Sequence, residues 1–141
     1  MSSMKNVHVL PFPIFQDERG CLIALESNKS IPFELKRIYY HFGNIDKKPR
    51  GFHAHKQLHQ VLICLNGSCK IKVANGMEKD EFILDSPMKG LYIGPMIWRE
   101  IEYGTNDSVL LALVSDYYDE SDYIRDYEKF LANCKKLRDK V

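Results

Sequence analysis

Apolar and polar residues alternate along most of the chain, and this pattern predicts short β-strands from about residue 7 to about residue 115. The segment "SCKIKVA" is the clearest case. On a strand, Cys69, Ile71 and Val73 would lie on one face and the two lysines between them on the other. The run "SVLLALVS" at residues 108–115 is apolar throughout, which predicts a strand buried on both faces.

Turn signals separate these segments. The dipeptides Asn66-Gly67 and Asn75-Gly76 each stand between strand-like runs, and Asn-Gly in that position predicts a β-hairpin. Two earlier runs, "CLIALES" and "LKRIYYHFG", are apolar or rich in the aromatic and β-branched residues that strands favour. Many short strands at regular spacing predict a β-sandwich or β-barrel.

The last part of the chain changes to a helical period. In "ESDYIRDYEKFLANCKKLRDK" the apolar residues at helical spacing are Ile124, Tyr127, Phe130, Leu131, Cys134 and Leu137. Ser121 is the predicted N-cap, acidic residues lead the first turn and basic residues fill the last. We expect one amphipathic C-terminal α-helix packed against a β-barrel.

Size and charge narrow the class of protein. At 141 residues, 45% of them hydrophobic, the chain is expected to form a single domain over residues 1–141 with its own core. With 20 basic and 19 acidic residues, the net charge of +1 gives no reason to expect nucleic-acid or membrane binding. The N-terminal "MSSMKNVHVLPFPIF" is expected to be neither a signal peptide nor a membrane span, because two prolines interrupt its apolar run.

The four cysteines include no Cys-x-x-Cys pair. Cys64 and Cys69 flank one of the Asn-Gly turns, so a disulfide between them is conceivable. We favour free thiols in a reducing compartment and therefore expect a cytoplasmic protein.

Candidate chemistry is concentrated in "PRGFHAHKQLHQVLICLNGS", where three of the five histidines fall within seven residues. His53 and His55 are two residues apart, so a strand would place both imidazoles on one face. From His55 onward, four residues precede Gln60 and six more precede Gly67. This spacing resembles the first motif of the cupin superfamily, whose His-x-His and Glu bind a metal inside a jelly-roll barrel. Gln60 can face the same interior only if the chain turns at residues 56–59, and His59 would then face outward.

The metal ligands of that motif are incomplete here. A second cupin motif usually brings a histidine shortly after a Gly-Pro turn, and in "GLYIGPMIWRE" Arg99 stands where that histidine is expected. Gln60 is neutral where a carboxylate is expected, and a guanidinium is a permanent cation that cannot ligate a metal. We therefore expect a metal-free barrel. A metal-dependent cupin oxygenase is the alternative, which metal analysis would test.

Much of the chain, from about Asp17 to about Tyr127, resembles one narrower family, the nucleotide-sugar 3,4-ketoisomerases. The matching segments are "DERG", "IPFELKRIYYHF", "PRGFHAHKQLHQVLICLNGS", "LDSPMKGLYIGPMIW" and "SDYYDESDYIRDY". The resemblance implies a homodimer of cupin-type jelly-roll barrels that needs no metal and no redox cofactor. It also implies the substrate dTDP-4-keto-6-deoxyglucose and a place in the synthesis of 3-amino sugars for bacterial surface polysaccharides such as O-antigen lipopolysaccharide.

The resemblance places His53 and His55 at C3 and C4 of the sugar as the proton-transfer groups. Moving a ketone from C4 to C3 requires loss of the C3 proton, an enediol, and return of a proton to C4. Imidazole suits both transfers because it titrates near neutral pH. Arg99 or the other histidine could stabilise negative charge on the C4 oxygen. The alternative is that both histidines only fill a polar barrel interior.

Further residues are candidates for substrate binding. Cations suited to the diphosphate are Arg37, Arg50 and Lys56, and aromatic rings suited to the thymine are Tyr39, Tyr92 and Trp98. Gln60, Arg19 and Arg99 complete the predicted substrate-binding set.

Arg19 and Arg99 bear on the configuration of the product at C4. Enzymes of this family that give the galacto product are similar in having an Arg at the position of Arg19 and a His at the position of Arg99. Enzymes that give the gluco product carry a Tyr and an Arg. This chain has one residue of each pattern, and we favour galacto only slightly. A dTDP-sugar 3,5-epimerase-like cupin and a non-catalytic nucleotide-sugar-binding cupin are the alternative functions.

Overall fold

The computed structural model describes residues 4–140, so the first three residues of the N-terminal stretch and the last residue of the predicted domain lie outside it. The strands are β1 Val7–Pro11, β2 Phe15–Asp17, β3 Gly20–Leu22, β4 Arg37–His41, β5 Arg50–His55, β6 Gln60–Asn66, β7 Cys69–Ala74, β8 Lys79–Leu84, β9 Lys89–Ile93, β10 Trp98–Tyr103, β11 Val109–Val114 and β12 Tyr123–Ile124. The helical segments are the 3₁₀ turns η1 Ile45–Lys47 and η2 Glu120–Asp122 and the α-helix α1 Tyr127–Asp139. The prediction of an all-β fold with one C-terminal helix is confirmed.

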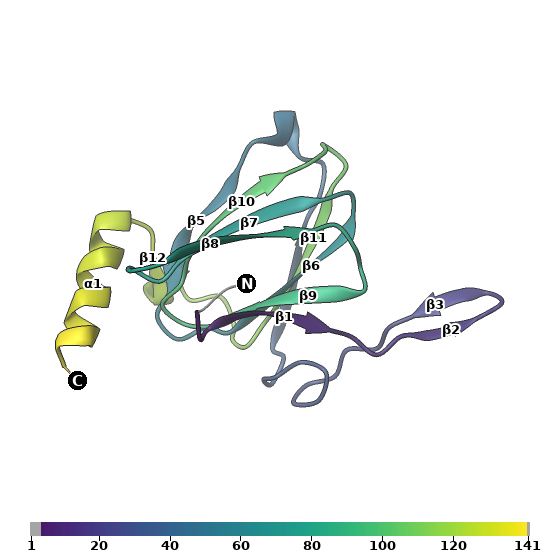
Figure 1. Ribbon diagram of the computed structural model, residues 1–141, viewed down its shortest axis with the longest axis horizontal. Helices are drawn as coiled ribbons and strands as arrows, with labels where there is room; N and C mark the ends of the chain where they lie inside the picture. Colours follow the sequence, from purple (N-terminus) through teal and green to yellow (C-terminus); the bar gives the residue numbers. More distant parts are fainter. Residues whose placement is uncertain (1–3, 141) are drawn as a thin grey trace.

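Two antiparallel five-stranded sheets form the body of the molecule. One has the order β1-β9-β6-β11-β4 and the other the order β12-β5-β10-β7-β8. From β4 to β12 the chain passes from one sheet to the other at every step except that from β7 to β8. This is the connectivity of a jelly roll. The β2–β3 hairpin projects from one end of the body, and α1 lies at the other end (Figure 1).

The main core fills the space between the sheets and follows the predicted alternation. Cys69, Ile71 and Val73 are buried in it, whereas the lysines between them are only partly covered. On β11, Leu110 contributes to this core and Leu113 to a second cluster on the other face of the sheet. The prediction that this strand is buried on both faces is therefore confirmed.

The two Asn-Gly turns have different roles. Asn75-Gly76 joins β7 to β8, which pair along their whole length, so this hairpin is confirmed. The hairpin predicted at Asn66-Gly67 is wrong, because β6 pairs with β9 and β11 whereas β7 pairs with β8 and β10. The turn carries the chain between sheets and is held by Ser108, whose Oγ donates to the Ser68 carbonyl oxygen at 2.8 Å. At Gly67, with φ of +73°, a Cβ would lie 2.6 Å from that Oγ.

The helix begins later than predicted. Its N-cap is Asp126, whose carboxylate accepts a hydrogen bond from the Lys129 backbone N–H, and not Ser121, which lies in η2. The reason is that Ile124 pairs with Ala54 as part of β12, which keeps this segment extended. The helix then buries Phe130 and Cys134 against Trp98, Ala54 and Ala74.

All four cysteines are free, as expected, although the Cys64 and Cys69 sulfur atoms are only 3.7 Å apart. Within residues 4–140, no helix has both the length and the apolar character that crossing a membrane requires.

Candidate active site

A cavity of about 440 Å³ opens into the body of the barrel. It is lined by Arg37, Tyr39, His41, Arg50, Gly51, Phe52, His53, Gln60, Arg99, Ile101, Tyr118, Tyr123 and Arg125. Successive side chains of β4 alternate between the two faces of its sheet. Arg37, Tyr39 and His41 face the cavity, whereas Ile38 and Tyr40 are exposed on the opposite face.

The two histidines of the His-x-His motif lie side by side on β5. Their ring centroids are 4.9 Å apart and the rings are nearly perpendicular, at 87°. His53 lines the main cavity, whereas His55 is only 1% exposed and lines a smaller cavity of about 140 Å³. The wall between the two cavities is formed by Arg37 and Tyr123, which line both of them.

A β-bulge next to His53 explains the glycine that precedes the motif. Opposite β5, Arg99 pairs with His53 and Glu100 pairs with Gly51, so Phe52 is an extra residue on its strand. Gly51 and Phe52 both have positive φ, +95° and +54°. A Cβ at Gly51 would lie 3.0 Å from the Arg99 carbonyl oxygen, so this position requires glycine.

Hydrogen bonds fix the tautomer of both rings. His53 Nδ1 lies 2.9 Å from the Gly51 carbonyl oxygen, and His55 Nδ1 lies 3.0 Å from Asp122 Oδ2. A carbonyl or carboxylate oxygen only accepts, so each Nδ1 carries the proton and each Nε2 presents a lone pair. Both Nε2 atoms are buried, and neither has a hydrogen-bond partner among residues 4–140.

Burial and the nearby Arg99 guanidinium keep both rings neutral. Desolvation first, and then the charge of Arg99, lower the pKa of His53 to about 4 and that of His55 to about 2. At neutral pH both imidazoles are therefore bases able to accept a proton at Nε2.

Arg99 is anchored by a chain of hydrogen bonds deep in the site. Its Nη1 donates to Gln60 Oε1 at 2.6 Å and its Nη2 donates to the Ile97 carbonyl oxygen at 3.0 Å. Gln60 Nε2 in turn donates to the Tyr39 hydroxyl at 2.7 Å. Burial lowers the pKa of Arg99 to about 10, so the side chain is still a cation at neutral pH. Its Nε atom is buried and has no hydrogen-bond partner in the described part of the chain.

These residues fit a metal ion poorly. The amide oxygen of Gln60 already accepts from Arg99, and a buried guanidinium beside two imidazoles opposes a second cation. Over residues 4–140, no group of three or more His, Cys, Asp or Glu side chains has a metal-binding arrangement.

The predicted turn after the motif is present, because β5 ends at His55 and β6 begins at Gln60. His59 does not line the main cavity, and its Nδ1 lies 2.6 Å from the Tyr92 hydroxyl. Tyr92 therefore contacts His59 and does not line the main cavity, where its prediction as a thymine-binding ring would place it.

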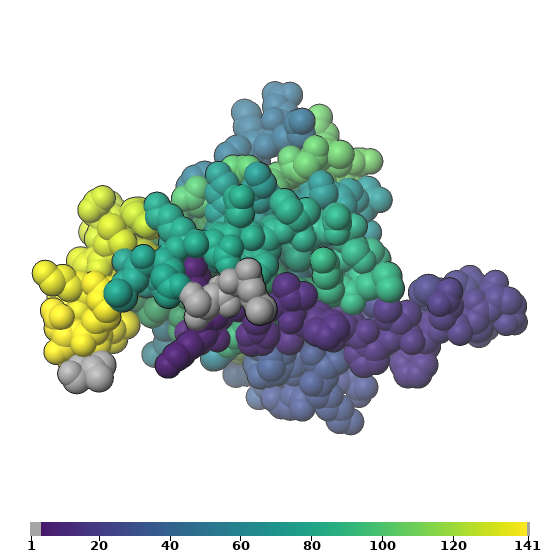
Figure 2. All heavy atoms as spheres, viewed as in Figure 1, coloured from purple at the N-terminus to yellow at the C-terminus, as the bar shows by residue number. Residues whose placement is uncertain are grey.

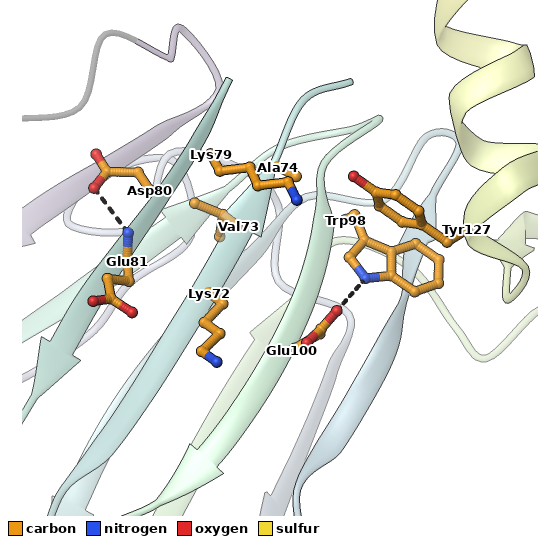
Figure 3. A pocket seen from close by; sticks show the side chains of 9 residues that line it. All are labelled: Lys72, Val73, Ala74, Lys79, Asp80, Glu81, Trp98, Glu100 and Tyr127. Atoms are coloured by element: carbon orange, nitrogen blue, oxygen red, sulfur yellow. Dashed lines mark hydrogen bonds between the residues drawn. The ribbon is translucent and has the colours of Figure 1, made fainter. Parts of the chain in front are cut away.

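Trp98 is also misplaced by the sequence prediction. Because its neighbour Arg99 faces inward, Trp98 faces the outer side of β10, where it is 5% exposed and packs against Phe130. It lines a separate outer groove beside α1, with its indole N–H donating to the Glu100 carboxylate (Figure 3). Trp98 therefore does not line the main cavity, where the predicted contact with thymine would place it.

Two predicted cations are also absent from the cavity. Lys56 is exposed beyond the end of β5. Arg19 lies on the β2–β3 hairpin, which projects from the body in Figure 2, and its side chain is 85% exposed and paired with Asp17. Neither residue lines the main cavity of its own chain.

Residues that the sequence analysis did not single out come from the segment before α1. The Tyr123 ring centroid lies 4.9 Å from that of His53 and 4.4 Å from that of His55. Arg125 stacks its guanidinium 4.2 Å from the centre of the Tyr123 ring and forms an ion pair with Glu120. The only sequence signal was the motif "SDYYDESDYIRDY", because nothing local indicates that β12 pairs with β5.

Comparison with known proteins identifies the family of the chain. The model of the family described as "FdtA: WxcM-like, C-terminal" matches residues 5–135. The chain belongs to this family. It is 52% identical over 129 residues to the TDP-4-oxo-6-deoxy-alpha-D-glucose-3,4-oxoisomerase of Aneurinibacillus thermoaerophilus, with 92% of this chain and 93% of the relative covered.

Solved structures agree with this membership. The 3,4-ketoisomerase QdtA of Thermoanaerobacterium thermosaccharolyticum, solved with TDP, is 46% identical with a TM-score of 0.91 and covers 95% of this chain and 98% of its own. A variant of QdtA has been solved with TDP-4-keto-6-deoxyglucose. The RmlC epimerase of Mycobacterium tuberculosis, at 16% identity and a TM-score of 0.73 over 87% of this chain and 70% of its own, shares the fold. The resemblance to the ketoisomerases, the cupin-type fold and the assignment as an isomerase are confirmed.

Proposed function

We propose that this enzyme moves the ketone of TDP-4-keto-6-deoxyglucose from C4 to C3. The observation that carries the proposal is the pair of neutral histidines, each with a free Nε2, beside the buried Arg99 cation. The membership of the FdtA family, whose relatives include sugar 3,4-ketoisomerases, supports the same substrate class.

Each step of this reaction has a suitable group in the site. One imidazole accepts the C3 proton at Nε2, the electron pair moves into an enediol, and a proton returns to C4. His53 lines the main cavity and His55 lies behind it, so together they can pass protons to and from the sugar without any other base. The product keeps all the atoms of the substrate.

Arg99 supplies the electrostatic stabilisation in this proposal. Negative charge develops on the C4 oxygen as the C3 proton leaves, and a fixed buried cation lowers the energy of that state. Gln60 holds the guanidinium in place, so no reorganisation is needed when the charge appears.

The cavity also supports a revised set of substrate-binding residues. Arg37 and Arg50 stay as candidates for the diphosphate, and Arg125 replaces Lys56 because it lines the cavity. Phe52 and Tyr118 are exposed aromatic rings in the cavity lining, so they replace Trp98 and Tyr92 as partners for the thymine.

We further propose that the enzyme is a homodimer. β4 lies at the edge of its sheet and exposes Ile38 and Tyr40, and Phe42 directly after it is also exposed, which is unusual for a surface that contacts only water. The projecting hairpin exposes Phe15 and Leu22 in the same way. Light scattering should give the mass of two chains, and a monomer would contradict the proposal.

The proposed homodimer gives Arg19 a role in the site of the partner. Arg19 lies on the projecting hairpin, outside the cavity of its own chain. It can bind substrate only if the hairpin enters the site of the partner. The pairing of Arg19 and Arg99 still favours a galacto product slightly over gluco. A cytoplasmic location and a place in 3-amino-sugar synthesis for surface polysaccharide belong to the same proposal.

One observation favours a second candidate, a 3,5-epimerase. Such an enzyme is expected to need a His-Asp dyad and a tyrosine acid, and His55, Asp122 and Tyr123 form such an arrangement. NMR of the product formed from TDP-4-keto-6-deoxyglucose in deuterated buffer separates the possibilities. Our proposal requires a 3-keto product, and deuterium appears at C4 wherever the proton on the imidazole exchanges with solvent before it is returned. An epimerase would keep the ketone at C4, and a protein that only binds would incorporate no deuterium.

A further inference from the structure

The Nδ1 side of the buried His55 ring faces a single carboxylate. Its Nδ1 lies 3.0 Å from Asp122 Oδ2, and the two side chains are 1% and 15% exposed. His53 uses a backbone carbonyl for the same purpose, so His55 is the member of the pair that is held by an ionisable partner. The contact joins residues 67 positions apart, so it depends on the tertiary fold.

The Asp122 carboxylate is itself fixed in position. Its second oxygen, Oδ1, accepts from the Gln57 backbone N–H at 2.8 Å. The Asp122 carbonyl oxygen accepts from the Lys56 N–H at 2.9 Å, and the next residue, Tyr123, pairs with His55 itself across β12 and β5. Oδ1 of Asp122 therefore accepts from the backbone, and Oδ2 accepts from the His55 ring.

We propose that Asp122 is a positioning residue for the ketoisomerase reaction: it holds His55 as the Nδ1–H tautomer, with the Nε2 lone pair directed to the proton-transfer site. When Nε2 accepts a proton, the carboxylate faces the imidazolium and stabilises it. When the proton is returned, the same tautomer is regenerated. This inference rests on the proposed function, because it assigns a task to one of the proposed proton-transfer groups.

The other charges around His55 oppose protonation of its ring. A carboxylate next to the ring is therefore needed to stabilise the imidazolium. The titratable and charged groups on the elements packed around the ring are His53, Arg99, Arg37, Arg125, Tyr123, Asp119 and Asp122. The cationic groups and His53 disfavour the imidazolium, and the acid whose carboxylate hydrogen-bonds to the ring in residues 4–140 is Asp122.

The first test reads the tautomer and needs no activity. We would record two-bond ¹H–¹⁵N spectra of ligand-free wild-type protein with labelled histidine, and assign His55 by the signals lost in His55→Asn. The proposal predicts a proton on Nδ1 in the wild type. In Asp122→Asn the amide N–H faces Nδ1, so the proton should move to Nε2. A proton on His55 Nε2 in the wild type would overturn the proposal. This result does not depend on whether Asp122→Asn folds.

The second test is kinetic and uses Asp119→Asn as the matched control. Asp119 also lines the small cavity, but its carboxylate accepts from Ser121 and not from His55. We expect Asp122→Asn to lower kcat by roughly 10²- to 10⁴-fold, as for loss of a positioned acid–base group. KM and TDP binding should be unchanged, because the substrate-binding groups of the main cavity do not include Asp122. Asp119→Asn should behave as wild type.

The outcomes separate this inference from the proposed function. If wild-type protein forms no 3-keto product, the proposed function fails and the tautomer spectra alone decide the role of Asp122. If the wild type and Asp122→Asn are equally active while His55→Asn is slow, the function stands and the positioning role is refuted. A higher KM with unchanged kcat would also refute it, because Asp122 would then only shape the cavity.

Discussion

The low pKa of His53 predicts that the enzyme stays active at pH values where an ordinary histidine base would be protonated. At about pH 5.5, a histidine with the usual pKa of 6.5 is neutral in about one molecule in eleven. A pKa of about 4 leaves about 97% of the molecules with neutral His53. The acid limb of kcat/KM should therefore lie about 2.5 pH units lower than for an unperturbed base, with a roughly tenfold difference in rate at pH 5.5.

The perturbation that tests the cause is Arg99→Met, because the charge of Arg99 is the second-largest contribution to the low pKa after burial. This variant keeps an unbranched apolar stem and removes the cation. Its acid limb, normalised to its own plateau, should move to higher pH although its plateau rate is lower. Arg138→Met removes an exposed guanidinium on α1 and should leave the limb unchanged.

The assay follows ketone movement by NMR at a series of pH values, and the histidine ring signals are titrated in the same samples. An acid limb near pH 6.5 in the wild type, or a limb that does not move in Arg99→Met, would refute this electrostatic explanation.

The same histidine gives a readout that needs no catalysis. Between pH 6.5 and about 4 the unfolded chain binds a proton at this position and the folded chain does not, so the free energy of unfolding falls as the pH is lowered through this window. The full effect of His53 is about 3 kcal/mol and is present above pH 6.5. Chemical denaturation of the wild type and of His53→Asn at several pH values measures it as a difference, because His41 and His55 also have lowered pKa values.

The remaining predictions concern the same site. His53→Asn and His55→Asn should each fold and bind TDP while turnover falls by about 10²- to 10⁴-fold, and near-normal rates in both would mean that the histidines only fill the barrel. Activity should survive exhaustive EDTA treatment because Gln60 and Arg99 replace metal ligands, whereas loss that a divalent ion restores would contradict the metal-free site. By product NMR, Arg99→His should increase the galacto product and Arg19→Tyr should shift it toward gluco, and an unchanged ratio in both would exclude control by these positions.

The sequence by itself determined the features that depend on local periodicity. Alternation identified the strands of the barrel, because successive side chains on a strand must point to opposite faces. The same rule placed His53 and His55 together, and it required the turn that returns Gln60 to the interior. The C-terminal helix followed from its 3.6-residue period, although its N-terminal boundary did not.

Tertiary structure decided which face of each strand meets the cavity and which distant segments complete it. Trp98 and Arg99 are neighbours with opposite directions, and only the packing of β10 between β5 and β7 shows that Arg99 is the inner one. The start of α1 moved because residues before it pair with β5 instead of forming a helical turn. That pairing also brings Asp122 and Tyr123 to the histidines. Contacts between residues so far apart in sequence leave no periodic signal, because they depend on strand pairing and not on the properties of the local chain.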